Sequence, residues 1–435
     1  MNILALCNQS EAIQIMKTIK CNKYFFICPI KIKQNQLPQN LKIGIDVWAY
    51  SHRSMRKGYY YPKMDWNKID PLDEKLIVDL SECESQTMRM IERIKRLRPM
   101  LYENRKKYYI NNLRYWSHVL LNNKISVFYR CAPPHEGYDN VISHLCDYYN
   151  IPAFYGNPFH THKGKYRYFA RYVKDNFPNF HNTTITNGEN EIELIEPLAD
   201  LLDIHWNKKK IPVLPTIIPR KKIKTQKTLL IRNKKLLDYY NNKCVVPNLT
   251  KPYIYFPLHY QYEATTCPMG GPFVDQWMAI EILSRLGIQI YVKEHPRISK
   301  NRDMNYYIRL LKMSNVNFIS MKSNNYSLID NSIAVATITG TAGWEAILRG
   351  KPSFIFGNIF YQYAPGVYKI NGMKTAIQAY NEVKYFKANK KEIELFLKKL
   401  QYYLFKHTTN DIIAALKENI ININNSEDRK IFIKE

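Results

Sequence analysis

The second half of the chain alternates short apolar runs with amphipathic segments, and this alternation constrains the fold more than any other feature. The runs at 253–258, 288–293 and 334–338 have the length and apolar content of buried strands, and segments of helical periodicity lie between them. Gly287 and Gly350 stand where such helices would end, as C-terminal caps often do. Strands that alternate with helices form a parallel sheet covered on both faces, so this region is predicted to be a doubly wound α/β domain.

The first half carries a less regular version of the same pattern. A strand at 126–130, a helix at 140–149 and a strand at 151–155 form a predicted βαβ unit, and a long basic and aromatic helix is expected over 84–121. A chain of 435 residues is also too long for one ordinary hydrophobic core, which favours two Rossmann-like domains. We expect an N-terminal domain over 1–206, a basic linker or excursion over 207–250, a C-terminal domain over 251–386 and a helical tail over 387–435.

The formal charge of +27 predicts attraction to anions, with nucleic acid, acidic lipid headgroups and phosphorylated substrates as the classes to consider. The sequence has no zinc-finger spacing, no RNP-type aromatic motif and no clear helix-turn-helix pattern, so nucleic acid is not an expected partner. An anionic membrane surface or an acidic substrate would account for the charge. A solvated surface whose lysines reflect a compositional bias would account for it equally well.

Cysteine usage and hydropathy bear on the compartment. The eight cysteines are scattered without CxxC pairs, which predicts neither a structural zinc site nor a disulfide framework. The first residues lack the charged start and long apolar core of a signal peptide, and no run approaches the ~18 apolar residues that span a bilayer. We expect a cytoplasmic protein that is soluble or peripheral on the inner membrane.

Polar side chains follow three of the predicted strands at their carboxyl ends, where doubly wound folds bind their ligands. Because these ends share one edge of the sheet, the three groups of side chains are expected to meet over the same crevice. The groups are His259, Gln261 and Glu263 after the first strand, Lys293, His295, Pro296 and Arg297 after the second, and Thr339, Gly340, Thr341 and Glu345 after the third.

The segment 339–341 has the chemistry of a phosphate cradle. It lies where a strand passes into a helix, so backbone N–H groups and the positive end of the helix dipole face outward. Small residues let a phosphate approach closely, and threonine hydroxyls add donors. A plain helix start capped by Thr341 would explain the same residues. Glu345, one turn further on, suits a hydrogen bond to a ribose or sugar hydroxyl, or is an acid favoured by the helix dipole.

His295 is expected to donate a proton or a hydrogen bond to a leaving phosphate, and Pro296 to fix the backbone that aims it. An isolated His-Pro pair is frequent by chance. Its position directly after a strand, with Lys293 and Arg297 adjacent, favours a phosphate contact instead.

His259, Gln261 and Glu263 alternate along the chain, so in an extended segment their side chains share one face. Such a row suits hydrogen bonds to a base or a polyhydroxylated substrate, although a solvated loop would give the same pattern. Metal binding by His259, Glu263 and His295 has no recognised ligand spacing, so neither a metal nor another cofactor is expected.

In the first half, His135, Glu136 and Asp139 follow a predicted strand and open a helix. An acidic residue here is well placed for general-base work on an acceptor hydroxyl, and all three residues compete for that role. Asp139 would serve equally well as a helix cap. His160 and Lys163 follow the next strand and are expected to bind an anionic group of the donor or the acceptor.

The stretch from Tyr253 to Val367 resembles the capsule polysaccharide biosynthesis family. The resemblance rests on three motifs in order, YFPLHYQYEAT, YVKEHP and ATITGTAGWEAILRGKPSFIFG. Members of the family are bacterial glycosyltransferases that add 3-deoxy-manno-octulosonic acid (Kdo) from its CMP-activated form. The resemblance implies a GT-B architecture, in which two Rossmann-like domains face a central cleft and the C-terminal domain binds the nucleotide.

The resemblance also implies roles for residues of the second half. His295 and Pro296 match the family's His-Pro motif and would contact the CMP phosphate, and 339–341 matches its Ser/Thr-Gly element. The family's Gln-Pro-like motif falls on Gln261, but Tyr262 stands where proline is frequent.

For the first half, the resemblance implies a catalytic base. Related CMP-sugar transferases carry an acidic pair followed by glycine, and an acid of this pair acts as the base. Here the triplet is His135-Glu136-Gly137, with histidine in the first position, so Glu136 inherits the role.

The implied activity is metal-independent transfer of Kdo or a similar acidic sugar from a CMP-activated donor to a lipid-linked or oligosaccharide acceptor. A UDP-sugar or CDP-polyol donor would need similar phosphate-binding parts. Charge alone would also suit a non-catalytic, membrane- or polyanion-binding subunit of a capsule assembly complex. The motifs leave the acceptor, the linkage and the choice between retention and inversion open.

Overall fold

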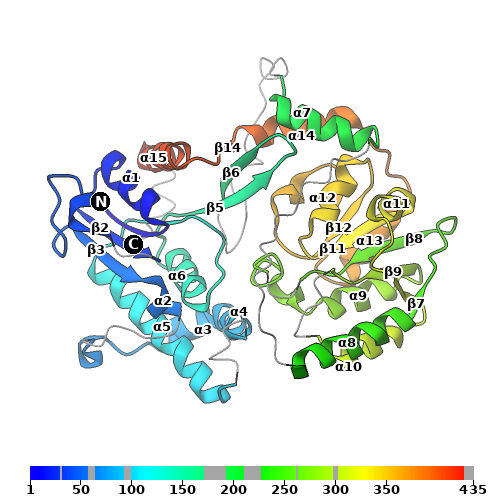
Figure 1. Ribbon diagram of the computed structural model, residues 1–435, viewed down its shortest axis with the longest axis horizontal. Helices are drawn as coiled ribbons and strands as arrows, with labels where there is room; N and C mark the ends of the chain where they lie inside the picture. The colour runs from blue at the N-terminus through cyan, green and yellow to red at the C-terminus, as the bar shows by residue number, and fades with distance from the viewer. Residues whose placement is uncertain are drawn as a thin grey trace. The chain divides into compact units, whose positions relative to one another are not determined.

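The computed structural model describes residues 1–29, 32–56, 64–92, 99–170, 193–209, 227–260, 263–296 and 302–425. The chain divides into two compact units, which are described separately (Figure 1). The first unit comprises residues 1–181 and 403–435, and the second comprises residues 182–402. The chain therefore leaves the first unit once and returns to it near its C-terminal end.

The first unit is built on a mixed sheet of seven strands in the order β14-β6-β5-β4-β1-β2-β3. Neighbouring strands from β3 to β5 are parallel, whereas β6 and β14 form an antiparallel edge. The strands are β1 (Asn2–Leu6), β2 (Lys23–Cys28), β3 (Val47–Ser51), β4 (Val127–Arg130), β5 (Ala153–His160), β6 (Lys165–Ala170) and β14 (Phe405–Lys406).

Helices cover both faces of this sheet. One hydrophobic core lies under α3 (Glu74–Asp79), α4 (Ser81–Ile91), α5 (Tyr102–Asn122) and α6 (Gly137–Tyr148), and the other lies under α1 (Gln9–Thr18) and α15 (Thr409–Asn425). The short helix α2 (His52–Arg56) and 3₁₀ turns at Gln34–Gln36 and Trp66–Lys68 complete the unit as described.

Two sequence predictions for this unit have different outcomes. The βαβ unit is confirmed, because β4 and β5 pair in parallel and α6 connects them. The single helix expected over 84–121 is wrong, because α4 ends at Ile91 and α5 begins only at Tyr102. Pro99 lies between them. Proline has no N–H to donate, and it disfavours helical backbone at the residue before it, so one continuous helix does not pass through this position.

The second unit contains a parallel sheet of seven strands in the order β13-β12-β11-β8-β9-β10-β7. Leaving out the short edge strand β7, this is the strand order of a dinucleotide-binding fold, and the order reverses between β8 and β11. The strands are β7 (Cys244–Val245), β8 (Tyr253–Pro257), β9 (Gln289–Lys293), β10 (Val316–Ile319), β11 (Ala334–Thr337), β12 (Ser353–Ile355) and β13 (Val367–Lys369).

Helices again cover both faces. The larger core lies under α8 (Lys227–Asn242), α9 (Gln276–Ser284), α10 (Met304–Leu311) and α13 (Met373–Val383), and the smaller one lies under α11 (Asn325–Asn331) and α12 (Thr341–Leu348). Two further helices, α7 (Glu196–Trp206) and α14 (Lys390–Gln401), contact each other, and α7 also contacts α12. Short 3₁₀ turns span Gly271–Val274 and Phe360–Tyr363. The doubly wound α/β class expected from the sequence is therefore confirmed in both units.

The boundaries of the units differ from those expected from composition. Helix α7 joins the second unit through α12 and α14, and α8 fills part of the segment expected to be a linker. Tyr240 of α8 is fully buried in the core, because its aromatic ring packs against β10 and α10. The proline-containing part of the predicted linker, 210–226, lies outside the described residues. The predicted helical tail is divided, since α14 belongs to the second unit and α15 to the first.

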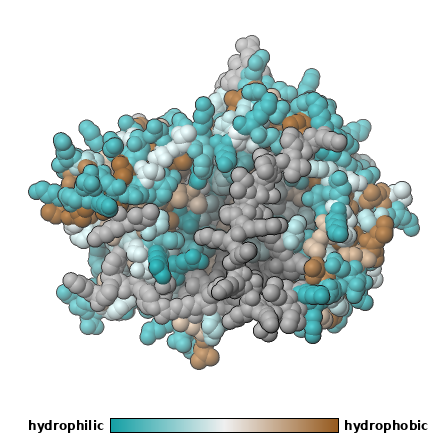
Figure 2. Space-filling model, viewed as in Figure 1, coloured by the Kyte–Doolittle hydropathy of each residue, from teal (hydrophilic) through white to brown (hydrophobic). Residues whose placement is uncertain are grey.

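Hydrophilic side chains cover much of the described surface on the face seen in Figure 2. None of the eight cysteines, all of which lie within the described ranges, forms a disulfide bond. Within the described ranges, none of the helices combines the length and the apolar character needed to cross a membrane.

Candidate functional site

A cavity of about 400 Å³ opens at the carboxyl ends of β8, β9 and β11, where the strand order of the second sheet reverses. Its walls come from the three segments that the sequence predicted to meet there. The predicted residues that line it are His259, Glu263, Lys293, His295, Pro296, Thr339, Gly340, Thr341 and Glu345. The structure therefore brings these residues together, whereas Gln261 and Arg297 lie outside the described residues.

His259 is a buried wall residue of this cavity. Its Nε2 atom lies 2.7 Å from the Thr337 hydroxyl and accepts a long hydrogen bond of 3.4 Å from the Thr339 N–H, which leaves the ring proton on Nδ1. Burial, with the positive charge of Arg302 as the second cause, lowers the pKa of His259 to about 3. The ring is therefore neutral near pH 7 and acts through hydrogen bonds rather than through charge.

The backbone at the start of α12 lies close to His259. Gly340 is the N-cap residue, no side chain caps the helix, and Thr341 is the first helical residue with an exposed side chain. Thr341 therefore does not cap the helix. The alternative offered by the sequence, a plain helix start capped by Thr341, is wrong. A Cβ atom on Gly340 would lie 2.6 Å from the Thr337 hydroxyl and 2.8 Å from Nε2 of His259, so only glycine fits without displacing them. The uncapped first turn lines the cavity and offers N–H groups to an anion.

Lys293 adds a cation to the same cavity. It is the last residue of β9, and its Nζ donates to the Ser323 carbonyl at 2.6 Å and to Oδ1 of Asn325 at 2.5 Å. Burial lowers the pKa of Lys293. An ammonium group has three donors, and these two acceptors account for two of them in the described part of the chain. One N–H is thus left for a ligand in the cavity.

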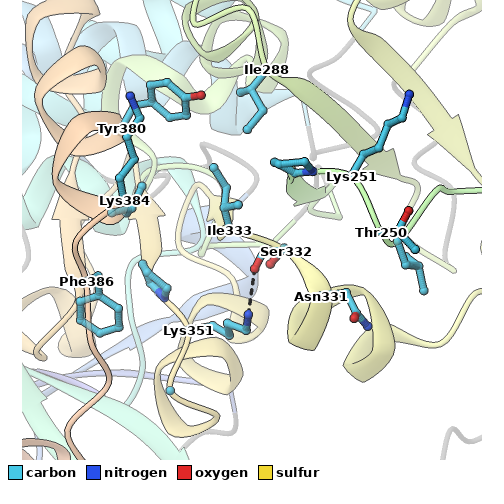
Figure 3. Close-up of a pocket in the computed structure, with 15 residues that line it drawn as sticks. Thr250, Lys251, Ile288, Asn331, Ser332, Ile333, Lys351, Tyr380, Lys384 and Phe386 are labelled. Atoms are coloured by element: carbon cyan, nitrogen blue, oxygen red, sulfur yellow. Dashed lines mark hydrogen bonds between the residues drawn. The ribbon is translucent and has the colours of Figure 1, made fainter.

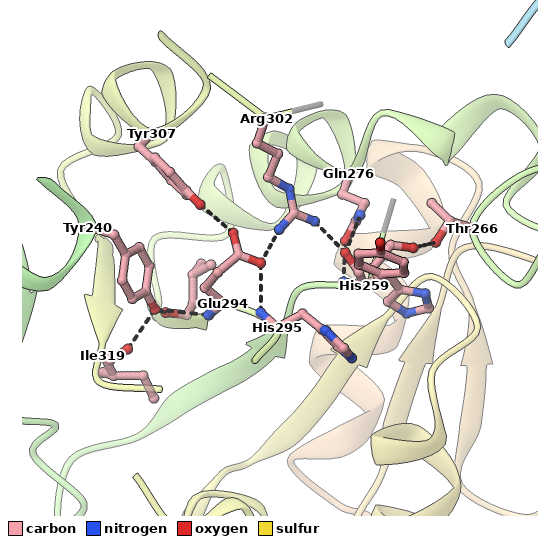
Figure 4. A network of polar contacts seen from close by, with 11 residues as sticks. Tyr240, His259, Thr266, Gln276, Glu294, His295, Arg302, Tyr307 and Ile319 are labelled. Atoms are coloured by element: carbon pink, nitrogen blue, oxygen red, sulfur yellow. Dashed lines mark hydrogen bonds and ion pairs between the residues drawn. The ribbon is translucent and has the colours of Figure 1, made fainter. Parts of the chain in front are cut away.

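A buried ion pair that the sequence did not single out holds the two histidine-bearing loops (Figure 4). The Glu294 carboxylate pairs with Arg302, and it accepts hydrogen bonds from the Tyr307 hydroxyl at 2.5 Å and from the His295 N–H at 2.6 Å. Arg302 also donates to the His259 carbonyl at 2.5 Å. One charge pair therefore fixes the backbone at both His259 and His295, and Arg302 keeps a raised pKa despite its burial.

Helix α8 supports the same network from behind. The Tyr240 hydroxyl accepts a hydrogen bond of 2.9 Å from the Glu294 N–H and donates one of 2.6 Å to the Ile319 carbonyl. One signal in the sequence could have pointed to this network: Glu294 directly follows a strand with an apolar centre, and an acid that is buried there must have a partner. The sequence pattern did not identify the partner of Glu294, because Arg302 lies in a polar loop.

His295 is half-buried and lines the cavity beside the ring of Tyr260, with ring centroids 5.7 Å apart and an angle of 36° between the planes. Its backbone is held by the hydrogen bond to Glu294 and is followed by Pro296. An imidazole held in this way can donate a hydrogen bond to an oxygen anion placed in the cavity.

Glu345 lies one turn into α12 and lines the same cavity. Burial raises the pKa of its carboxyl group to about 7, against the opposing effect of the Arg349 charge. Near neutral pH the group therefore exists both as a carboxylic acid and as a carboxylate. Either form can hydrogen-bond a hydroxyl group, the first as a donor and the second as an acceptor.

In the first unit, the Asp139 carboxylate is already occupied. It pairs with Arg130 at 2.6 Å, and it accepts hydrogen bonds from the N–H groups of His135 at 3.0 Å and Glu136 at 2.9 Å. Both charged side chains are almost completely buried. Asp139 therefore holds the start of α6 from within its first turn, as the third helical residue. The N-cap residue is Glu136, so Asp139 is not the cap that the sequence offered as the alternative to catalysis.

Glu136 follows β4, next to the reversal in the strand order of the first sheet. Its carboxylate pairs with Nε of Arg56 at 2.9 Å, and the Arg56 side chain is 48% exposed. His135 precedes it and is half-buried. Glu136 thus has a cation that can move into solvent, whereas Asp139 has a buried one, and this difference favours Glu136 as the proton acceptor.

His160 ends β5, and Lys163 is exposed in the turn to β6. The short strand β14, which the sequence analysis did not predict, places His407 on this edge, where Nε of Arg167 donates to its Nδ1 at 2.7 Å. Burial lowers the pKa of His160, and the charges of Lys165 and Arg167 lower it further. This edge of the first sheet is therefore positively charged and suits an anionic group.

His259, Glu263 and His295 line one cavity. Within the described ranges, no group of three or more His, Cys, Asp or Glu side chains is placed to hold a metal ion.

Comparison with known proteins identifies a family for part of the chain. Residues 284–410 match the family described as capsule polysaccharide biosynthesis protein. The capsule polysaccharide modification protein LipA of Neisseria meningitidis (serogroup A, serotype 4A) is 33% identical over 72 residues. That segment covers 17% of this chain and only 10% of LipA.

Two solved structures are similar over longer stretches. One is the β-Kdo 2,7 transferase of Thermosulfurimonas dismutans KpsC, with 14% identity, a TM-score of 0.32 and coverage of 76% of this chain and 95% of that one. The other is a UDP-GlcNAc 2-epimerase from Methanocaldococcus jannaschii, with 11% identity, a TM-score of 0.28 and coverage of 92% and 100%. At these identities and TM-scores, neither structure indicates the donor or the reaction of this chain.

Proposed function

We propose that this chain is a glycosyltransferase, and the support is the match of its residues 284–410 to the family described as capsule polysaccharide biosynthesis protein. The donor is a nucleotide-activated acidic sugar, CMP-linked Kdo or a close analogue. The acceptor is a lipid-linked glycan or an oligosaccharide. Protein groups rather than a metal ion offset the charge on the departing nucleotide.

One observation carries this proposal: three anion-favouring groups line a single cavity at the carboxyl edge of a doubly wound sheet. They are the Lys293 ammonium, the His295 imidazole and the uncapped first turn of α12. Each of these favours a phosphate by charge or by hydrogen bonds, and fixed donors cost little reorganisation when negative charge develops. The cavity of about 400 Å³ is within the range of small-molecule sites.

In the proposed reaction, an acceptor hydroxyl oxygen attacks the anomeric carbon of the donor sugar. The bond between that carbon and the CMP phosphate oxygen breaks, and CMP leaves. His295 donates a hydrogen bond or a proton to the departing phosphate, while Lys293 and the α12 start offset its charge. Glu136 accepts the proton of the acceptor hydroxyl, because Asp139 is held by its buried partner Arg130.

The remaining groups of the cavity bind hydroxyl groups. Glu345, with a carboxyl pKa of about 7, suits the ribose or a sugar hydroxyl. His259 presents a neutral ring, and the exposed side chain of Glu263 stands at the same cavity. In the first unit, the basic edge that carries His160 and Lys163 suits a carboxylate of the donor or acceptor.

A UDP-sugar or CDP-polyol donor would use the same phosphate-binding groups, so the nucleotide is the point to test. A ligand that binds only the folded protein raises its melting temperature, and CMP, UMP, UDP and CDP can be compared in one thermal-shift panel. We expect CMP to give the largest rise. A larger rise with UDP or CDP would identify another donor, and no rise with any of the four would favour a non-catalytic subunit of a capsule assembly complex.

The catalytic part of the proposal is tested with the variant His295→Ala and CMP-Kdo as donor. Loss of one group that stabilises a developing anion lowers turnover by about 10²–10³-fold, so we expect CMP release to fall by this factor. The matched control is His118→Ala, since His118 hydrogen-bonds Asn122 within α5 and lies outside the cavity. Both variants should keep the wild-type melting temperature within a few degrees. Undiminished transfer by His295→Ala would refute the assigned role.

We also propose that the enzyme works at an acidic membrane surface, where a lipid-linked acceptor would be found. The support is the net charge of +27, since basic residues near acidic headgroups contribute favourably until salt screens them. Flotation with phosphatidylglycerol vesicles at low and high salt tests this. We expect binding that is lost at high salt, and equal binding to neutral vesicles would contradict it.

A further inference from the structure

A second cavity of the second unit lies at the opposite edge of its sheet from the site described above. It has a volume of about 610 Å³, and it is lined by residues that immediately precede four neighbouring strands (Figure 3). Pro252 precedes β8, Ile288 precedes β9, Ile333 precedes β11 and Pro352 precedes β12. Because β8 is five residues long, about 16 Å of strand separates the two cavities, so they are distinct.

Lys351 is one of three lysines that line this cavity. Its Nζ donates to the Ser332 carbonyl at 3.1 Å, and burial and the nearby charge of Lys208 lower its pKa. A nearby acid, Asp330, accepts hydrogen bonds from Nε and Nη2 of the Arg349 guanidinium. Lys351 therefore keeps donors for a ligand and has a second cation nearby.

The other two lysines are Lys251 and Lys384. Lys384 lies over the ring of Tyr380, with its Nζ 4.7 Å from the ring centroid, and it donates to the Asn381 amide oxygen at 3.3 Å. Lys251 is exposed and stands at the junction with a neighbouring cavity of about 370 Å³, which shares Ile288 and Tyr380 with the first. Among the described residues that line the two cavities, none is acidic. Cations gathered around a hollow without acids favour a bound anion.

The walls between these lysines are apolar. Ile288, Ile333, Val383 and Phe386 line the cavity together with the ring of Tyr380. A small inorganic anion would contact the lysines but would leave this apolar surface in contact with water. A neutral apolar molecule would cover the surface but leave the ammonium groups without a counter-charge. A ligand that matches both features carries a negative head and an apolar body.

We propose that this cavity binds an amphiphilic anion, a phosphate or carboxylate group attached to an apolar chain. Lys251, Lys351 and Lys384 stand on separate sides of the cavity (Figure 3), so the head pairs with one or more of them, and the chain lies against Ile288, Ile333 and Phe386. The neighbouring cavity gives the chain room to continue past Ile288. The assignment uses no residue of the proposed transferase site, and it holds whether or not the protein transfers a sugar.

The test uses octyl phosphate below the concentration at which it forms micelles, with inorganic phosphate and octyl glucoside as comparison ligands. Binding to the full chain is measured by isothermal titration calorimetry in the presence of saturating CMP, so that the first cavity is filled. We expect octyl phosphate to bind at least about 10-fold more tightly than either comparison ligand, since head and chain contribute separately. The variant Lys251→Gln/Lys351→Gln/Lys384→Gln should weaken it by at least about 10-fold, which corresponds to ~1.4 kcal/mol.

The matched control removes the same number of positive charges elsewhere, as Lys312→Gln/Lys391→Gln/Lys406→Gln, at exposed positions outside both cavities. Equal weakening in this control, or equal affinity for inorganic phosphate and octyl phosphate, would overturn the proposal. The melting temperature of the triple variant, compared with that of wild type, shows whether it keeps its fold. Competition by phosphatidylglycerol vesicles would identify a membrane lipid as the source of the anion. Binding of octyl phosphate that the vesicles do not reduce would identify a soluble molecule as the source of the anion. Both results support the site.

Discussion

The hydroxyl of Thr337 and the imidazole of His259 lie 2.7 Å apart, and this contact joins the end of β11 to the loop after β8. The same hydroxyl accepts the Gly340 N–H at 3.0 Å, so the start of α12 is held by the group that orients the histidine. A neutral histidine and a helix start are therefore fixed by one threonine. Substitutions near Thr337 should therefore weaken ligand binding more than the change in side-chain volume suggests.

Gly340→Ala is expected to displace His259 and weaken binding of the nucleotide. The backbone of Gly340 has a φ of −78°, which any residue adopts, so the cost comes only from the added Cβ meeting Thr337 and His259. We expect the affinity for CMP to fall at least about 10-fold by calorimetry. Gly372→Ala is the control, because its Cβ would meet no atom within 4 Å. Wild-type CMP affinity in Gly340→Ala would show that the cradle tolerates a displaced ring.

Glu294→Gln is expected to destabilise the second unit strongly. Removal of one member of a buried ion pair leaves the other charge unpaired and costs about 3–5 kcal/mol in the free energy of unfolding. Denaturation by urea measures this cost. The double variant Glu294→Leu/Arg302→Met removes both charges and should be more stable than Glu294→Gln. It should still bind CMP less well than wild type, because the hydrogen bonds to the His259 carbonyl and the His295 N–H are gone.

Glu345→Gln is expected to change how stability depends on pH. Burial raises the carboxyl pKa from 4.5 to about 7, so between these values the folded protein holds a proton that the unfolded chain has released. The stabilising effect of that proton is complete below about 4.5 and is lost as the pH rises through about 7. The melting temperature of Glu345→Gln relative to wild type should therefore increase from pH 5 to pH 8. A difference that does not change with pH would mean that Glu345 is ionised throughout.

Glu136→Gln and Asp139→Asn should have opposite effects on turnover and stability. The partner of Glu136 is the half-exposed Arg56, so loss of that pair costs little stability, while loss of a general base lowers turnover by about 10²–10⁴-fold. Asp139→Asn leaves the buried Arg130 without its counter-charge and should lower the melting temperature clearly. Steady-state rates with CMP-Kdo and thermal unfolding separate the two. Normal turnover by Glu136→Gln would remove it as the base.

The sequence predicted the second unit well because its strands are short, apolar and regularly spaced. The expected strands at 253–258, 288–293 and 334–338 each differ from the observed strand by one residue at an end. Parallel strands place their carboxyl ends at one edge, so the pattern of strands alone was enough to group the residues that follow them into a site. The roles of those residues remain predictions.

Contacts between distant segments could not be predicted in the same way. The pairing of Glu294 with Arg302 depends on how a polar loop folds back, and periodicity carries no information about that. Helix α8 lies in a lysine-rich stretch that composition alone assigned to a linker, yet Tyr240 makes it part of the core. The strand β14 has two residues, too few for an alternating pattern to be recognised.

The return of α15 to the first unit sets an order for folding during synthesis. Ile413 and Leu416 share a core with Ala12 and Ile15 of α1, although the chain between them includes the whole second unit. When the ribosome has made residue 402, the sequence of the second unit is complete, but α15, which packs against α1 in the first unit, has not yet been made. The later-made unit can thus finish folding before the earlier one. In the nascent chain, the apolar residues of α1 that α15 covers therefore stay exposed until α15 emerges.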